Sequence, residues 1–284
     1  MNGEEGLRSA TEGAPLSSDG ADRGVASTPA HVWREGTWDP QAVPVPKEEP
    51  VTITLNGREF ITLLATPEDR VALVVGFLYD EGIVDRVDQV VSWEETSEGV
   101  SVEAQGVDMA SRLFERRVLT SGCGKSFAFA SALDAFSVSA RRLPEATPWV
   151  GASAIQAAVG EVYRGGPLYR RARGTHAAAL VETSGRVVAF AEDIGRHNAI
   201  DKVVGRLLLD GRSFEGLFVV VTGRISSEMV GKIAKTPIPL VVSKSVPTAL
   251  ALEYAARLSL CVVGRAGGRG FTVYGHPELI DPAG

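Results

Sequence analysis

Apolar and polar residues alternate in the first segment of the chain that is expected to be structured. Residues 51–55 alternate in the way of a half-buried strand. Asn56-Gly57 follows directly and is a strong signal for a two-residue hairpin turn. Residues 60–64 are rich in apolar and β-branched side chains and suit the return strand. The pattern therefore predicts a β-hairpin here.

A helix is predicted to follow this hairpin. Thr66-Pro67 suits its start, with the threonine as cap and the proline at the first helical position. Apolar residues then recur at helical spacing until Gly82. A second pair of strands is expected at 90–93 and 100–104. Together these elements predict a small α+β lobe over residues 47–117.

The chain before this lobe has a different character. Residues 1–46 are rich in Gly, Ala, Ser, Pro and Glu and poor in aliphatic residues. Such a segment buries too little apolar area to offset the entropy of ordering it. We therefore expect residues 1–46 to be a flexible tail.

The second half of the chain alternates strand-like and helix-like segments. The run 217–221 is apolar throughout, as in strands that are buried on both faces. Further strands are expected at 175–180, 187–190, 240–243, 260–263 and 271–274, and helices at 126–136, 155–162, 199–209, 228–234 and 247–258. This alternation predicts an α/β domain over residues 118–284, with a mixed or largely parallel sheet and helices on its faces.

Composition and charge narrow the classes of protein that these elements can form. The chain has 284 residues, 44% of them hydrophobic, which is enough for a sizeable core. The net charge of −6 argues against a protein that coats nucleic acid, because phosphate binding depends on a basic surplus. No apolar run reaches the roughly 18 residues that span a bilayer, and the start lacks the pattern of a secretory signal. We expect a cytoplasmic protein that binds neither nucleic acid nor membrane.

Cysteine is scarce, and one of the two cysteines has an unusual setting. Cys123 and Cys261 are too few for a disulfide framework or a four-thiolate zinc site. Cys123 lies between Gly122 and Gly124, just before an expected helix, and Lys125 follows two residues later. A helix N-terminus and cations stabilise the thiolate, which is the form that attacks or carries sulfur. We predict that Cys123 is the working thiol, with a small buried turn residue as the alternative, and that Cys261 belongs to the core.

Basic and hydroxyl side chains follow three of the expected strands where each strand ends. Arg224 and Ser226 follow the strand at 217–221, Lys244 follows the next one, and Arg265 follows the last buried one. The carboxyl ends of parallel strands meet at one edge of a sheet, where ligands of open α/β sheets bind. Guanidinium groups, hydroxyls and helix N-termini suit phosphate. The sequence thus predicts an anionic, nucleotide-like ligand, although Ser226 alone would also serve as a helix cap.

The densest polar stretch is 192–202, between an expected strand and an expected helix. Within it, His197 suits an acid, a base or, together with Arg196, a phosphate contact. Asp193 or Asn198 suits the cap of the helix. The sequence leaves these roles open.

Two other kinds of chemistry can be weighed from the same residues. His176, Glu192, Asp193 and His197 have side chains that ligate metals, but no spacing among them matches a zinc pattern. A cysteine hydrolase would need Cys123 together with His176 or His197 as base, and no spacing supports either pairing.

The segments together resemble the formate dehydrogenase accessory sulfurtransferase family (FdhD/NarQ), from about Val51 to Tyr274. The two most specific runs are Glu192–Ala199 and Gly223–Met229. The other matching motifs are Asn56-Gly57, Thr66-Pro67, Gly76-Phe77-Leu78, Glu81-Gly82, Thr120–Gly124, Thr175–Ala178, Asp201-Lys202, Ser243, Pro247-Thr248, Gly264-Arg265 and Val273-Tyr274.

The resemblance implies a fold, a set of partners and a bound substrate. The larger domain would be a cytidine-deaminase-like, three-layer domain, and the protein a homodimer. It would take persulfide sulfur from a cysteine desulfurase and pass it to the molybdenum or tungsten bis-guanine-dinucleotide cofactor that formate dehydrogenase needs. Cys123 matches the persulfide cysteine. The segment that matches a cofactor-binding region comprises Val263, Gly264, Arg265, Ala266, Gly267 and Gly268.

The chain departs from the family pattern in one respect. Many members carry two cysteines in a C-x-x-C loop, whereas Lys125 and Ser126 follow here with no second thiol. A two-cysteine relay is therefore excluded, and a single persulfide carrier remains sufficient. The P-C-x-x-C pattern, which carries the paired cysteine ligands of zinc deaminases, is absent from the sequence as well, so no zinc is expected.

The leading hypothesis is thus a sulfurtransferase in which Cys123 carries the persulfide. The residues expected to hold the phosphates of the cofactor are Arg224, Ser226, Lys244, Arg265 and His197, the last with either a proton-transfer or a phosphate role. A non-catalytic chaperone for the molybdenum cofactor and a cysteine hydrolase are the alternatives.

Overall fold

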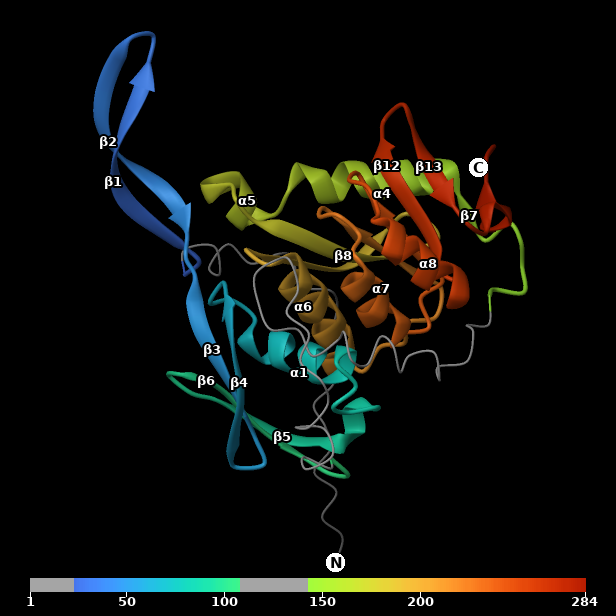
Figure 1. The fold of residues 1–284 in the computed structure, drawn as a ribbon, viewed down its shortest axis with the longest axis horizontal. Helices are drawn as coiled ribbons and strands as arrows, with labels where there is room; N and C mark the ends of the chain where they lie inside the picture. The colour runs from blue at the N-terminus through green and yellow to red at the C-terminus, as the bar shows by residue number, and fades with distance from the viewer. Residues whose placement is uncertain (1–22, 108–142) are drawn as a thin grey trace, which may run out of the picture.

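The computed structural model describes residues 23–107 and 143–284 and is centred on a six-stranded sheet (Figure 1). Its strand order is β13-β12-β11-β10-β8-β9. The three middle strands β10, β11 and β12 pair in parallel, and the other strands join antiparallel. The bounds are β8 His176–Glu182, β9 Val187–Asp193, β10 Leu217–Val221, β11 Leu240–Ser243, β12 Cys261–Gly267 and β13 Gly270–Tyr274.

Helices cover both faces of this sheet, which explains the apolar run in β10. Every residue of β10 is buried, with Val219 in the core on one face and Val220 in the core on the other. The first core lies under α6 (Arg196–Leu209), α7 (Ser227–Ala234) and α8 (Ala249–Arg257), and the second under α4 (Ala152–Arg164). The mixed α/β architecture is thereby confirmed. Its likeness to cytidine deaminases stays a prediction.

Smaller elements that were not predicted from the sequence complete this part of the molecule. They are α5 (Pro167–Ala172), the 3-10 turn η4 (Pro277–Leu279), and the two-residue strands β7 (Val150–Gly151) and β14 (Ile280–Asp281), which pair in parallel.

The predicted α+β lobe is a four-stranded sheet with one helix against it. The strand order is β4-β3-β6-β5, and residues Asn56 and Gly57 make the hairpin turn, both with positive φ. The alternation of β3 buries Val51, Ile53 and Leu55 beneath the helix α1. The bounds are β3 Glu49–Leu55, β4 Arg58–Ala65, α1 Arg70–Asp80, the 3-10 turn η2 Val87–Gln89, β5 Val90–Glu95 and β6 Gly99–Ala104.

The predicted cap of α1 is wrong. The helix begins at Arg70 with Asp69 as its N-cap, whereas Thr66 is fully buried. The Thr66 hydroxyl donates to Asp193 and accepts from Lys202, so it is engaged in a contact with the larger part of the molecule. The local sequence predicted that the Thr66 hydroxyl would cap the helix, but this hydroxyl makes a long-range tertiary contact instead.

The lobe joins the rest of the molecule where α1 crosses α6. A Cβ atom at Gly76 would lie 1.8 Å from the carbonyl oxygen of Asp201, and one at Gly205 would lie 1.9 Å from that of Ala72. Neither position can hold a larger side chain without moving a helix. Two glycines therefore let the backbones of α1 and α6 touch.

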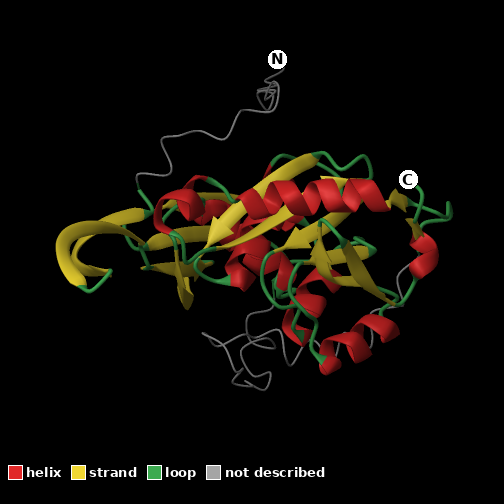
Figure 2. Cartoon of the chain, turned by 90° about the horizontal axis from the view of Figure 1, so that it is seen from above, coloured by secondary structure: helices red, strands yellow, loops and turns green. Residues whose placement is uncertain are grey.

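Residues 25–46 form a β-hairpin, which corrects the prediction of a flexible tail for this segment. The strands β1 (Val25–Arg34) and β2 (Thr37–Pro46) pair along their whole length around the turn at Glu35-Gly36. The hairpin, called the arm below, projects from the body in both views (Figure 1, Figure 2). Most of its residues are exposed, so it lacks the apolar alternation by which strands are recognised.

Some predictions fall outside the described ranges. The boundary predicted between residues 117 and 118, and the helix predicted at 126–136, lie there. Within residues 23–107 and 143–284, no helix is long and apolar enough to cross a membrane.

Candidate functional site

Three strand ends meet at one edge of the sheet, as the sequence predicted. Val221 at the end of β10 pairs in register with Ser243 at the end of β11. The Ser243 hydroxyl donates to the Gly223 carbonyl oxygen at 2.8 Å, and the Arg265 N–H donates to the Ser245 carbonyl oxygen at 2.8 Å. The segments that follow β10 and β11 are therefore bonded to each other and to Arg265, which lies inside β12, and the three present one continuous rim.

The predicted basic residues lie exposed along this rim. Arg224, Lys244 and Arg265 are all exposed. The Lys244 ammonium lies 5.1 Å from the centre of the Tyr163 ring, and the Tyr163 hydroxyl donates to the carbonyl oxygen of Thr222. The rim is thus electropositive, and Tyr163 of α4 packs against it.

Ser226 occupies the N-cap position of α7 without serving as a cap. Its side chain makes no capping hydrogen bond, and its buried Oγ has no hydrogen-bond partner among the residues that the structure describes. A buried hydroxyl without a partner costs free energy. This unused hydroxyl is available to a ligand, and the alternative of a simple cap is not supported.

The antiparallel strand β8 brings further residues to the same edge. The Thr222 N–H donates to the Ala177 carbonyl oxygen, and His176 Nδ1 lies 3.4 Å from Thr222 Oγ1. A Cβ atom at Gly223 would lie 3.1 Å from the Arg196 side chain and 3.5 Å from His176 Nδ1. Gly223 therefore leaves room for both side chains beside the rim.

Two more polar groups at this edge lack partners. Arg196 Nε and Thr175 Oγ1 are buried and have no hydrogen bond to any residue of the described ranges 23–107 and 143–284. Burial lowers the pKa of His176, and the neighbouring Arg196 charge lowers it further. Both effects favour the neutral form of the His176 imidazole.

These unpartnered groups define what the edge can bind. Arg196, Ser226 and Thr175 each offer a donor, and buried donors are normally satisfied. A guanidinium beside hydroxyls and a helix N-terminus suits phosphate or another oxyanion. The sequence pointed to Ser226 and noted Arg196. It placed Thr175 in an expected strand and in a motif of the family, but it did not indicate that this residue would lie at the rim, because the antiparallel pairing of β8 brings it there.

His197 reaches the same edge but is already paired. Its Nε2 lies 3.0 Å from Oε2 of Glu228, and both side chains are largely buried. This contact joins the first turn of α6 to the first turn of α7. The structure thus places His197 between two helices at the rim, and its role toward a ligand stays a prediction.

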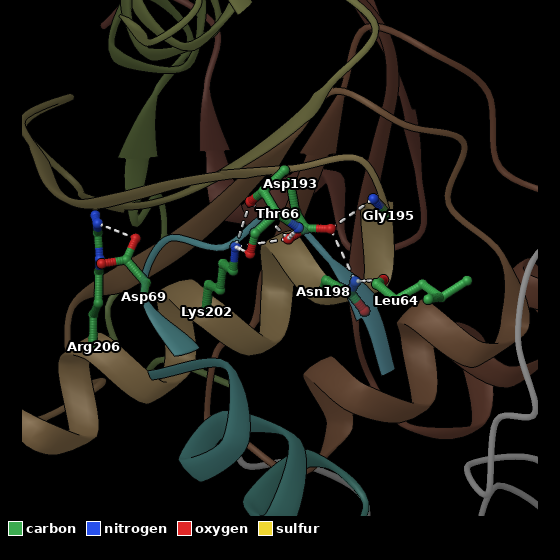
Figure 3. Close-up of polar contacts among 8 residues, drawn as sticks. All are labelled: Leu64, Thr66, Asp69, Asp193, Gly195, Asn198, Lys202 and Arg206. Atoms are coloured by element: carbon green, nitrogen blue, oxygen red, sulfur yellow. Dashed lines mark hydrogen bonds and ion pairs between the residues drawn. The ribbon is translucent and has the colours of Figure 1, made fainter. Parts of the chain in front are cut away.

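Other residues of the 192–202 run serve the architecture (Figure 3). Asp193 Oδ2 accepts from the Thr66 N–H at 3.0 Å and lies 2.7 Å from Lys202 Nζ. Asp193 Oδ1 accepts from Gly195 N–H and from Asn198 Nδ2, which also donates to the Leu64 carbonyl oxygen. The predicted capping roles of Asp193 and Asn198 are thus replaced by a link between the lobe and the start of α6.

Two neighbouring carboxylates also have structural partners. Glu192 accepts from the N–H groups of Leu168 and Tyr169 in the first turn of α5. Asp201 lies 2.8 Å from Lys232 Nζ, which also contacts Glu81 of the lobe at 2.7 Å. In the described part of the chain, no group of three or more His, Cys, Asp or Glu residues is arranged to hold a metal ion.

The predicted cofactor segment divides into core and surface. Val263, Gly264 and Ala266 are buried, and the side chains of Val263 and Ala266 pack in the core beneath α4. Arg265, Gly267 and Gly268 line an open depression of about 510 Å³ at the turn between β12 and β13. Only the second group can offer side chains or exposed backbone to a ligand.

The structure describes one of the two cysteines, Cys261, but not the other. Cys261 is fully buried, and burial raises the pKa of its thiol to about 12, so it is an unreactive core residue as predicted. Cys123 lies outside the described residues, and its predicted role and the cysteine–histidine pairing of a hydrolase stay untested.

The fold is that of an α/β protein, and exposed cations lie along one edge of its sheet. A model of the FdhD/NarQ family matches residues 46–281, so the chain belongs to that family, as the resemblance indicated.

Similar proteins agree with this assignment. The "Sulfur carrier protein FdhD" of Shouchella clausii is 34% identical over 263 residues, covering 89% of this chain and 97% of that protein. The Bacillus subtilis protein of the same name is 35% identical over 82% of this chain and 88% of its own. A crystal structure from Desulfotalea psychrophila, described as a formate dehydrogenase accessory protein, superposes with a TM-score of 0.73 at 26% identity. It covers 90% of this chain and 99% of that one.

Proposed function

We propose that this protein is a sulfur carrier that serves formate dehydrogenase. Two observations support the proposal. The chain belongs to a family whose similar members are named sulfur carrier proteins. It also has a rim of unpartnered donors and exposed cations, which suits a phosphate-bearing ligand. The second observation carries most weight, because it comes from the chain itself.

Sulfur transfer through Cys123 is the chemical step of the proposal. The Cys123 thiolate attacks the outer sulfur of a persulfide on a cysteine desulfurase, and the desulfurase thiolate leaves. Cys123 then holds the persulfide, with no net oxidation or reduction. A single thiol suffices for this exchange.

The recipient of the sulfur is the molybdenum or tungsten bis-guanine-dinucleotide cofactor, bound as a substrate. Arg196, Ser226 and Thr175 would take its buried phosphate oxygens, because these are the donors left without partners. Arg224, Lys244 and Arg265 would add charge at the exposed side of the rim. These residues bind and orient the ligand, and they leave the sulfur chemistry to Cys123.

Incubation with a cysteine desulfurase and free cysteine should add one sulfur atom to the protein, measured as the intact mass. The adduct should disappear in Cys123→Ala, because that variant has no accessible thiol. Cys261→Ala is the matched control and should keep the adduct, since the Cys261 thiol is buried. An adduct that survives in Cys123→Ala would sink the proposal. If Cys123→Ser still supports active formate dehydrogenase, the non-catalytic cofactor chaperone is the correct function instead.

Guanine nucleotide binding tests the rim separately from the thiol. Arg196→Gln and Ser226→Ala should each weaken binding of guanosine diphosphate by about ten- to a hundredfold, the loss expected for a charge-assisted hydrogen bond. Arg186→Gln is the matched control, because Arg186 pairs with Glu182 at the far end of the sheet. Titration calorimetry measures all three. Equal affinities for Arg196→Gln and Arg186→Gln would contradict the proposed phosphate site.

A further inference from the structure

One tyrosine side chain contacts two of the segments that form the rim. Tyr163 lies in the last turn of α4, the helix that covers one face of the central sheet (Figure 1). Its hydroxyl lies 3.2 Å from the carbonyl oxygen of Val221 and 3.0 Å from that of Thr222, at the end of β10. The same hydroxyl accepts the N–H of Lys244, which follows β11, at 3.1 Å. Tyr163 therefore joins the ends of two neighbouring parallel strands.

The Tyr163 hydroxyl acts as a donor and as an acceptor at the same time. A tyrosine hydroxyl has one O–H to donate and lone pairs that accept. Here the O–H faces the carbonyl oxygens of Val221 and Thr222, and a lone pair takes the N–H of Lys244. Burial raises the pKa of the Tyr163 phenol, so the group keeps the proton that it donates. Phenylalanine at this position would lose all of these contacts together.

The ring of Tyr163 contacts the same lysine a second time. The Lys244 ammonium lies 5.1 Å from the centre of the ring. A cation within about 6 Å of the centre of an aromatic ring is attracted to its face. Lys244 is exposed, and an exposed lysine side chain otherwise has many rotamers to choose from. The ring therefore restricts where the Lys244 charge can lie.

The residues on either side of Lys244 are held by other bonds. The Ser243 hydroxyl donates to the carbonyl oxygen of Gly223, and the Ser245 N–H donates to the Ser243 hydroxyl at 3.0 Å. The N–H and the ammonium of Lys244, in contrast, both contact Tyr163. The course of the backbone is thus set by the rim, and the place of the Lys244 charge is set by Tyr163.

The place of this charge matters because unpartnered donors lie close by. Thr222, whose carbonyl oxygen contacts Tyr163, is followed by Gly223, and Gly223 lies against the side chain of Arg196. One ligand at this edge can therefore meet Arg196 and Lys244 together. A cation that is already held in place loses less conformational entropy when the ligand binds, so more of the attraction appears as affinity.

We propose that Tyr163 is a positioning residue for the anionic ligand of the rim and that it acts through Lys244. The hydroxyl fixes the main chain of Lys244 against the end of β10. The ring fixes the ammonium, which is then preorganised for a phosphate group. This inference rests on the proposed function, because it takes a phosphate-bearing ligand at the rim as its starting point.

Titration calorimetry of the full-length chain with guanosine diphosphate tests the inference. Lys244→Gln should weaken binding by about fivefold, the upper end for an exposed ionic contact. Tyr163→Phe keeps the ring and loses the hydroxyl, and it should weaken binding by about threefold. Tyr163→Leu loses the ring and the hydroxyl, and it should reach the loss of Lys244→Gln, about fivefold.

Tyr79→Phe is the matched control for Tyr163→Phe. Tyr79 is also half-buried, and its hydroxyl also donates to a backbone carbonyl oxygen, that of Lys235 at 3.1 Å. That contact lies at the C-terminal end of α7, whereas the N-terminal end of this helix lies at the rim. Tyr79→Phe should therefore bind guanosine diphosphate as tightly as the wild type. A Tyr163→Phe variant that binds as tightly as Tyr79→Phe would overturn the inference.

A double-mutant cycle shows whether Tyr163 acts through Lys244. In Tyr163→Leu combined with Lys244→Gln, no ammonium is left to position, so the loss should equal that of Lys244→Gln alone, about fivefold. Independent contributions would instead multiply to about 25-fold. The larger loss would show that Tyr163 affects the ligand by another route, and it would reject the proposed role.

Amide hydrogen exchange tests the same contact without a ligand. The Lys244 N–H is bonded to the Tyr163 hydroxyl, so it should exchange about tenfold faster in Tyr163→Phe than in the wild type. Tyr79→Phe should leave this rate unchanged. An equal rate in Tyr163→Phe and the wild type would contradict the positioning of Lys244 by the hydroxyl.

The wild-type titration separates this inference from the proposed function. A wild-type protein that binds no guanosine diphosphate would overturn the proposed ligand site, and the positioning role would fall with it. A wild type that binds the nucleotide, together with a Tyr163→Leu variant that binds it equally well, would overturn the positioning role alone.

Discussion

Asp193→Ala should destabilise the protein by about 3–5 kcal/mol, the cost of leaving a buried charge without its partner. The partner is Lys202, whose ammonium is fully buried and lies 2.7 Å from Asp193 Oδ2. Without the carboxylate, the ammonium keeps only the hydroxyl and carbonyl oxygens of Thr66 as acceptors. The Thr66 N–H loses its acceptor as well. Urea unfolding followed by circular dichroism measures the change.

Two companion variants make this prediction specific. Glu182→Ala removes an exposed carboxylate from its pair with Arg186, and it should cost less than about 1 kcal/mol. Asp193→Leu combined with Lys202→Met buries no charge, and it should be more stable than either single variant. If Asp193→Ala and Glu182→Ala cost the same, the buried pair does not hold the lobe in place.

Lys232→Met should destabilise the protein by a similar amount, about 3–5 kcal/mol at neutral pH. Lys232 is the one cation that directly contacts the buried carboxylates of Glu81 and Asp201 in the described structure. It also lies 5.2 Å from the centre of the Phe77 ring. Removing it leaves carboxylates from α1 and α6 facing one another in a buried space. Lys235→Met, at the half-exposed end of the same helix, is the matched control and should cost little.

The loss in Lys232→Met should depend on pH. Burial raises the pKa of Asp80 well above its usual range, and the nearby Asp201 raises it further, while Lys232 lowers it. Burial likewise raises the pKa of Glu81, and Lys232 again opposes the rise. Without the lysine, both carboxyls hold protons in the folded state that the unfolded chain releases. A group whose folded pKa is raised in this way loses stability as pH rises above its unfolded value.

The direction of the pH dependence follows from the charge states of Lys232 and its carboxylate neighbours. Burial opposes the charge of Lys232, but Asp201 and Glu81 outweigh burial and raise its pKa, so the wild-type lysine is charged throughout the neutral range. The deficit of Lys232→Met should therefore grow between about pH 5 and pH 8 and shrink toward about pH 4. Urea unfolding of both proteins at several pH values measures it. A deficit that is the same at every pH would show that lost packing, rather than charge, explains the change.

The sequence was a good guide wherever burial left a local pattern. The alternation of residues 51–55, the turn at Asn56-Gly57 and the apolar run of β10 each correspond to the predicted element. The rim was predictable for the same reason, since the ends of successive buried strands must meet if the strands pair in parallel. Its exposed cations, Arg224 and Lys244, lie where that argument placed them.

Predictions failed where the deciding contact was distant or absent. The arm was taken for a tail because neither of its faces is fully buried within one chain, so its strands carry no apolar alternation. Thr66 was taken for a cap because its partners, Asp193 and Lys202, lie far away in the sequence. The same distance hid the structural role of Asp193. Thr175 was placed in an expected strand and in a family motif, but its position at the rim was not predicted, because that position depends on the sheet topology.

The glycine contact between α1 and α6 has a consequence for how this protein can be divided. The backbones of α1 and α6 are in contact at Gly76 and Gly205. Two lysine side chains also reach across this junction: Lys202 contacts Thr66, and Lys232 contacts Glu81. A fragment without the lobe would leave the buried ammonium groups of Lys202 and Lys232 with fewer acceptors. It would also expose the surface of α6 that packs against α1. The lobe is thus no detachable module. We expect the lobe and the larger sheet to unfold as one cooperative unit, so a minimal working version of this protein should retain both.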